Sequence, residues 1–199
     1  MTITITFTKK EKEFIKRVAQ LRTIETEGKR DIKAYGSVTK FFDCFENNVV
    51  AIMTEAAVVK FMGLDLTKTP LEVWPSFYIA EHKSFYDGSD VRIDGQNYEV
   101  RRTNKKDNPL AVRSKDVKEN TINIKTFIEY KEPVAGQKVP LEDIVPVVYL
   151  MGWIHSSAYH DDSLSEQPWW AKRQGTDDRV VTDANLNPME TLLKQEALV

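Results

Sequence analysis

The alternation of apolar and polar residues at the start of the chain predicts a short strand followed by a helix. Ile3, Ile5 and Phe7 alternate with threonines, which is the period of a strand. Residues 8–24 then carry apolar side chains at helical spacing, with lysines and arginines on the opposite face. The apolar positions of this predicted helix are Phe14, Ile15, Val18 and Leu21.

A second, more apolar helix is predicted over residues 41–62. Its apolar residues recur every three or four positions, and Gly63 is placed to end it. Glu55 lies in the middle of this apolar pattern. An acid in that environment is a candidate for chemistry.

Strand patterns dominate the rest of the chain. The predicted strands are 74–83, the two arms of a hairpin within 90–102, 121–130, 144–155 and the strand-like segment 178–183. A helix or turn is expected over 114–120, a loop-rich stretch over 166–178, and a short amphipathic helix from Pro188. The expected fold class is therefore α/β or α+β, a mixed central sheet flanked by helices.

The segment DVRIDGQNYEVRR (90–102) alternates charged and apolar residues around an Asp-Gly pair. If Asp94 to Asn97 form the turn, Arg92 faces Glu99 and Asp90 faces Arg101. The charged residues of both arms then share one face, and Val91, Ile93, Tyr98 and Val100 share the other. This face is either a pair of surface salt bridges or a place where two carboxylates can hold one metal ion.

Composition narrows the class of protein. The chain has 199 residues and is 41% hydrophobic, which suits one folded domain. The single cysteine, Cys44, excludes an intramolecular disulfide, and an intracellular, cytoplasmic location is expected. No apolar run reaches the roughly 18 residues that span a bilayer, so no membrane partner is expected.

The charges are distributed unevenly although the net charge is only −2. Residues 92–118 contain eight basic and four acidic side chains, whereas residues 160–199 contain eight acidic and four basic ones. Such a polarised chain either presents a cationic face to a polyanion or carries ordinary solvated surfaces.

The order of these signals resembles the PD-(D/E)xK nuclease superfamily, the restriction-endonuclease-like fold. Its pattern is an acid in a helix, an Asp at a strand, and a short hairpin leading to a Glu-x-Lys strand. Here MTEAAVVKFMGL, with Glu55, resembles the helix, and SDVRIDG supplies Asp90. Glu99-Val100-Arg101 takes the Glu-x-Lys position.

The resemblance covers roughly residues 45–155 and implies a nuclease core of about 41–155 within one domain, 1–199. A strand-helix pair would precede this core and a loop-rich extension would follow it. The resemblance also implies a phosphodiesterase that cuts DNA with Mg²⁺, or Mn²⁺ in its place. Asp90, Glu99 and the Val100 carbonyl would ligate the ion, and Glu55 would bind a second ion or orient a water.

Arg101 departs from the family pattern, which has lysine there. Arginine can hold a phosphate but stays charged, so it is a poor proton carrier. Arg101 therefore either positions water and phosphate, or another cation such as Lys105 or Lys106 replaces the lysine, or the site is inactive.

The basic run after the hairpin is a candidate DNA contact, although a charged loop would have the same composition. Its candidate residues are Arg102, Lys105, Lys106, Arg113, Lys115 and Lys118. Near the C-terminus, His155 and His160 have no regular ligand spacing and are interpreted as structural. Trp169 and Trp170 either anchor the tail or stack on bases.

Two alternatives to a nuclease stay open. One is a catalytically inactive DNA-binding or DNA-mimicking accessory protein with the same fold, which the arginine would favour. The other is a protein-interaction or assembly component, which the acidic, tryptophan-containing C-terminal region would favour. A homodimer is a further expectation, since a double-strand cut usually needs two such sites.

Overall fold

The computed structural model describes residues 2–26, 44–68, 89–114, 117–118, 120–130, 140 and 144–196. The strand predicted at 74–83 lies outside the described residues. So do Lys115 and much of the connection predicted over 114–120.

Five strands form a mixed sheet in the order β1-β6-β5-β3-β2. They are β1 (Ile3–Thr6), β2 (Val91–Ile93), β3 (Gln96–Thr103), β5 (Thr121–Tyr130) and β6 (Ile144–His155). Strands β3 and β5 run parallel, and the other neighbours run antiparallel. The prediction of a mixed sheet combined with helices is confirmed, and the chain belongs to the α+β class.

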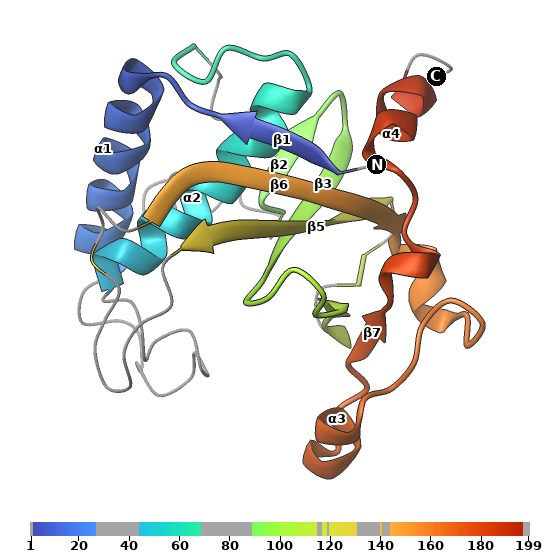
Figure 1. Ribbon diagram of the computed structural model, residues 1–199. Coiled ribbons are helices and arrows are strands. Elements are labelled where there is room, and N and C mark those ends of the chain that lie inside the picture. The colour runs from blue at the N-terminus through green and yellow to red at the C-terminus, as the bar shows by residue number, and fades with distance from the viewer. Residues whose placement is uncertain are drawn as a thin grey trace.

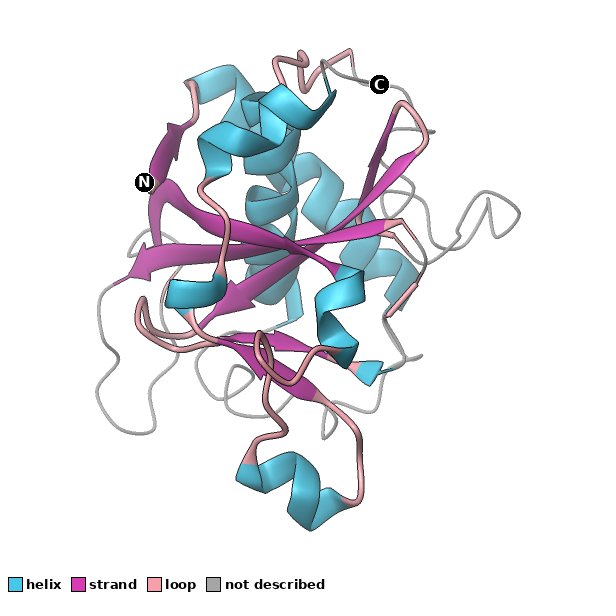
Figure 2. Cartoon of the chain, turned by 90° about the vertical axis from the view of Figure 1, so that its right-hand side faces the viewer, coloured by secondary structure: helices cyan, strands magenta, loops and turns pink. Residues whose placement is uncertain are grey.

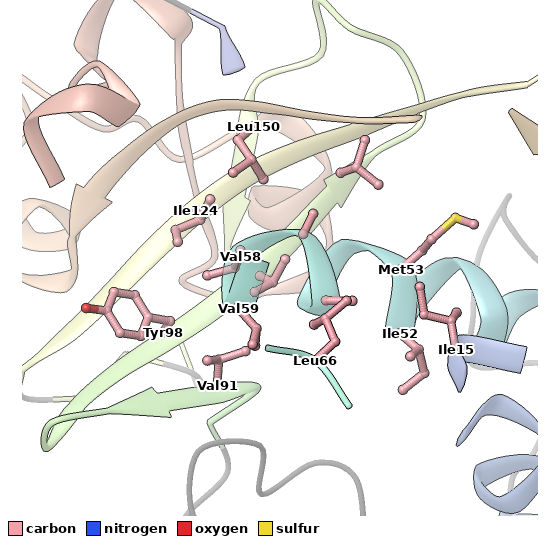
Figure 3. Packing of buried hydrophobic residues seen from close by; sticks show 14 of the residues in the cluster. Ile15, Ile52, Met53, Val58, Val59, Leu66, Val91, Tyr98, Ile124 and Leu150 are labelled. Carbon is pink, nitrogen blue, oxygen red and sulfur yellow. The ribbon is translucent and has the colours of Figure 1, made fainter. Parts of the chain in front are cut away.

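Helix α2 (Cys44–Phe61) covers one face of this sheet, and α1 (Lys9–Thr26) packs against α2 (Figure 1). Every residue from 52 to 59 is buried, because the helix has the sheet on one side and α1 on the other. Figure 3 shows Val58 and Val59 of α2 directed toward Tyr98 and Ile124 on the strands. The sequence pattern predicted both helices.

The opposite face of the sheet is partly covered by a small two-stranded sheet (Figure 2). It pairs β4 (Leu110–Val112) with β7 (Arg179–Val181), and Leu110, Val112 and Val181 pack with Ile154 of β6. Helix α3 (Trp169–Gln174) projects beyond this small sheet, and the chain continues through a 3-10 turn (η6, Asp183–Asn185) to α4 (Met189–Glu196).

One strand in this region was not expected from the sequence pattern, and one expectation was wrong. The connection from β3 to β5 contains the strand β4, which the pattern did not predict, and Leu110 and Val112 of this strand pack with Ile154. The stretch predicted as loop contains α3, which Gly175 ends in a left-handed conformation with φ 65°. In the part of the chain that the structure describes, no helix is long and apolar enough to cross a bilayer.

Candidate functional site

The β2–β3 hairpin turns at Asp94 and Gly95, not over four residues as expected. Their φ angles of 48° and 83° are both positive, as in the two-residue type I′ turn that Asp-Gly favours. Ile93 therefore pairs with Gln96 and Arg92 with Asn97, so the predicted pairs Arg92–Glu99 and Asp90–Arg101 were wrong. The shift is two residues, so the predicted faces are kept, and Val91, Tyr98 and Val100 are buried in the core.

The backbone of Asp90 lies opposite Tyr98, just beyond the last paired residues Val91 and Tyr98. Asp90 lies just before β2, and its N–H donates to the carbonyl of Tyr98 at 3.1 Å. Its carboxylate oxygen Oδ2 accepts the N–H of Val100 at 2.8 Å, next to the point where β2 begins. Because the N–H and C=O of a strand residue point to the same side, the Val100 carbonyl is also directed toward Asp90. The hairpin thus holds the Asp90 carboxylate against the backbone of Val100, the residue that follows Glu99.

The carboxyl group of Asp90 has a raised pKa. Burial is the largest cause, and the nearby charge of Glu55 is the second; together they raise the pKa of Asp90 to about 6. Arg101, the Val100 N–H and Arg22 act in the opposite direction. A carboxyl group held against another acid at the edge of a sheet is typical of functional sites.

Glu55 reaches this site from α2 and is bound by an arginine that the sequence pattern did not reveal. The guanidinium of Arg22 donates to both oxygens of Glu55, at 3.1 and 3.0 Å, and both residues are buried. Arg22 continues the helical spacing of Ile15, Val18 and Ala19, so it occupies the apolar face of α1. The predicted Leu21 is instead 42% exposed. A basic residue at an apolar-face position was the signal that could have identified it.

Glu99 and Arg101 form an ion pair on β3. The distance from Arg101 Nη2 to Glu99 Oε2 is 2.7 Å, and the Glu99 side chain is almost fully buried. Glu99 and Arg101 are two positions apart on one strand, so both side chains lie on the face opposite the core. Arg101 therefore lies beside the candidate metal ligand, where the family pattern has lysine.

Of the two lysines suggested as replacements, Lys106 has its amine near another group of the chain. Lys105 is exposed in the turn after β3. The amine of Lys106 lies 5.4 Å from the ring centre of Tyr149 on β6. Lys125 of β5 is paired with Arg101 in the sheet, but its amine binds Asp183 at 2.5 Å and the Lys106 carbonyl at 2.9 Å. The amines of Lys106 and Lys125 are thus engaged with other groups of the chain.

The residues present suit a hard divalent cation such as Mg²⁺. Among the described residues, no group of three or more His, Cys, Asp and Glu side chains is arranged to hold a metal ion. Magnesium, however, commonly uses only one or two carboxylates and keeps several waters. Asp90 and Glu99 with the Val100 carbonyl match that need, and a cation would offset the repulsion between Asp90 and Glu55.

The candidate DNA contacts are distributed over several elements. Lys105 and Lys106 are exposed in the turn after β3, and Arg113 is exposed just after β4. Arg102 and Lys118 are partly buried, and by strand alternation Arg102 lies on the face opposite Arg101. Lys115 lies outside the described residues.

The C-terminal candidates have separate environments. His155 Nδ1 accepts the N–H of Ser157 at 3.2 Å, and His160 packs edge-on against Tyr159. Trp169 is 71% exposed on α3. With Pro109 and Trp170 it lines a hollow of about 440 Å³.

No protein-family model, no curated protein and no solved structure matches this chain. Its function has to be inferred from its own residues.

Proposed function

We propose that this chain is a Mg²⁺-dependent DNA endonuclease of the restriction-endonuclease-like type. The observation that supports this most is the hydrogen bond from the Val100 N–H to the Asp90 carboxylate, which holds that carboxylate beside the Glu99-Val100-Arg101 strand. Asp90, Glu99 and the Val100 carbonyl are the ligand types of the D…ExK pattern, in the order that the pattern requires. The raised pKa of Asp90, caused by burial and by Glu55, adds to this.

Each residue has a distinct role in the proposed reaction. Asp90, Glu99 and the Val100 carbonyl hold the cation, which when bound lowers the pKa of a water and neutralises charge on the phosphodiester. Glu55, fixed by Arg22, orients water next to Asp90. Arg101 keeps Glu99 in place and lies where it can hold an anionic phosphate oxygen.

A second candidate function follows from the same arginine. Arg101 occupies one oxygen of Glu99 at 2.7 Å, and a guanidinium is a poor proton carrier. A DNA-binding protein that has lost catalysis would have this arrangement. Replacing Arg101 by lysine tests this candidate, because only an inactive site would gain cleavage from the change.

The deciding experiment is a cleavage assay on supercoiled and branched DNA with Mg²⁺, Mn²⁺ or EDTA. We expect nicking by the wild type that depends on the metal and falls at least 100-fold in Asp90→Asn and in Glu99→Gln. Both changes keep the size of the side chain and remove its charge. Asp94→Asn is the matched control, because Asp94 is exposed on the same hairpin and asparagine tolerates its positive φ.

Binding without cleavage by the wild type under every metal would select the inactive DNA-binding protein. Failure to bind DNA at low salt would contradict both candidates and leave the protein-interaction component.

A further inference from the structure

Strands β3 and β5 place a continuous polar patch on the sheet face opposite α2. The parallel register pairs Asn97 with Thr121, Glu99 with Asn123 and Arg101 with Lys125. The residues between them, such as Val100 and Ile124, belong to the core on the other face. We call these six residues the polar ladder.

Four of the six residues of the polar ladder are buried, which is unusual for neighbouring polar side chains. Thr121, Asn123 and Lys125 are fully buried, and Glu99 is 2% exposed. A solvent-facing surface would explain polar residues at no cost, but these four side chains are shielded from solvent. Their polar groups therefore need partners.

The polar groups at the two ends of the ladder differ in their hydrogen bonding. At the cationic end, the amine of Lys125 is bound by Asp183 and by the Lys106 carbonyl, and Arg101 is bound by Glu99. At the other end, Asn97 Oδ1, Thr121 Oγ1 and Asn123 Oδ1 are buried and have no hydrogen-bond partner within the described part of the chain.

Asn123 is the best defined of the three. Its amide nitrogen Nδ2 donates to Ser156 Oγ at 3.0 Å, and this fixes the carboxamide. The oxygen Oδ1 has no hydrogen-bond partner among the described residues. It lies on the strand next to that of Glu99 and on the same face of the sheet. A buried acceptor without a partner costs roughly 1–3 kcal/mol, so such an atom usually serves a ligand or a bound water.

The groups around Asn123 Oδ1 indicate which kind of ligand this oxygen would bind. Two amide oxygens and the carboxylate of Glu99 are acceptors, so they would repel an anion and favour a cation or the hydrogens of its bound water. Oxygen atoms of this kind suit a hydrated divalent metal ion. Amide and hydroxyl groups that hold the waters of a metal ion, or the ligands themselves, are common around metal sites.

We propose that Asn123 Oδ1 accepts a hydrogen bond from a water on the divalent cation that Asp90 and Glu99 bind. Strand β5 thereby forms the second wall of the metal site, with Asn97 and Thr121 extending it. This inference rests on the proposed function only for the presence of the ion, and it assigns to β5 a role that the D…ExK pattern does not contain.

The test is Mn²⁺ titration of the full chain by calorimetry or electron paramagnetic resonance, without DNA. We expect Asn123→Ala to weaken Mn²⁺ binding by about 10-fold, as is typical for residues that hold a ligand or a bound water. Asn123→Asp should instead tighten binding at least threefold, because it adds a negative charge beside the ion. Ser156→Ala is the matched control, since it removes the partner of Nδ2 and keeps Oδ1; its affinity should stay within about threefold of the wild type.

Each outcome tests the role of β5 separately from the nuclease activity. Mn²⁺ binding that needs Asp90 but is unchanged by Asn123→Ala and Asn123→Asp would overturn the role of β5, even if the protein cuts DNA. Absence of Mn²⁺ binding at millimolar concentration would overturn it as well. If the wild type leaves DNA intact but Asn123→Ala weakens Mn²⁺ binding, the role of β5 is supported although the proposed function fails. If Asn123→Ala does not fold, the Mn²⁺ affinity of the isosteric variant Asn123→Asp tests the role of β5 by itself.

Discussion

Asp90 carries a carboxyl group whose charged form is destabilised by the folded protein. Burial and the charge of Glu55 raise its pKa to about 6, whereas an unfolded aspartate titrates near pH 3.9. Between about pH 4 and pH 6 the folded chain therefore holds a proton that the unfolded chain has lost. The stability that protonated Asp90 contributes is present at pH 4 and is lost as the pH rises through 6.

The change Asp90→Asn removes this dependence. Its amide oxygen can still accept the Val100 N–H, but the group is never charged. We expect the free energy of unfolding at pH 7.5, in EDTA, to rise by about 1–3 kcal/mol, and its decrease between pH 4 and pH 6 to become shallower. Urea denaturation across this pH range measures both effects. A variant less stable than the wild type at pH 7.5 would contradict the assignment, and Asp94→Asn should change neither quantity.

At the scale of single residues, the sequence indicated the acids of the site better than their partners. Glu55 stood out because it interrupts an apolar helix pattern, and Asp90 and Glu99 because they flank an Asp-Gly turn. Arg22 did not stand out, because its bond to Glu55 joins two helices that only the folded chain brings together. Asn123 and Lys125 were hidden in the polar half of a strand pattern, which is normally solvent-exposed.

At the scale of elements, the long strands were predictable and the short ones were not. Strands β5 and β6 have the predicted bounds, because ten or more residues carry a clear pattern. Strand β4 has three residues and exists through its pairing with β7, far along the chain. The hairpin register was predictable in principle, since Asp-Gly alone specifies a two-residue turn. The expectation failed because it assigned Gln96 and Asn97 to the turn.

Gly152 of β6 offers a test of how the C-terminal segment is held. A Cβ atom there would lie 2.9 Å from Leu186 Cβ and 3.0 Å from the Asn187 carbonyl oxygen. Asn187 exchanges two backbone hydrogen bonds with Trp153, at 3.0 and 2.8 Å, so its backbone has little freedom to move. We expect Gly152→Ala to lower the free energy of unfolding by about 1–3 kcal/mol through overpacking.

Hydrogen exchange shows where this effect acts. The amides of residues 183–192 should exchange faster in Gly152→Ala, because the segment is displaced from β6. Gly175→Ala is the control: its φ of 65° makes the change strained, but no atom lies within 4 Å of the added Cβ. The control should lose stability without faster exchange at 183–192. Equal exchange in the two variants would mean that Gly152 does not govern this contact.

At the scale of the whole molecule, the fold separates two groups of exposed cations. Lys105 and Lys106 follow the strand that carries Glu99, whereas Lys172 and Arg173 lie on α3, which projects beyond the small sheet (Figure 1). If DNA is bound at the Asp90–Glu99 site, the first group lies closest along the chain to the cut. The second group lies in a region where acidic residues outnumber basic ones.

The salt dependence of DNA binding distinguishes these two surfaces. Each phosphate contact that is lost lowers the slope of log Kd against log salt concentration by about 1. We expect Lys105→Gln with Lys106→Gln to reduce the slope by about 1–2, and Lys172→Gln with Arg173→Gln to leave it unchanged. Fluorescence anisotropy of labelled DNA in EDTA, in the Asp90→Asn background, measures binding without cleavage. The reverse result would place DNA along α3, where the exposed Trp169 could stack on bases. The carboxylates of the hairpin would then lie away from the bound strand, so this result would also count against the nuclease.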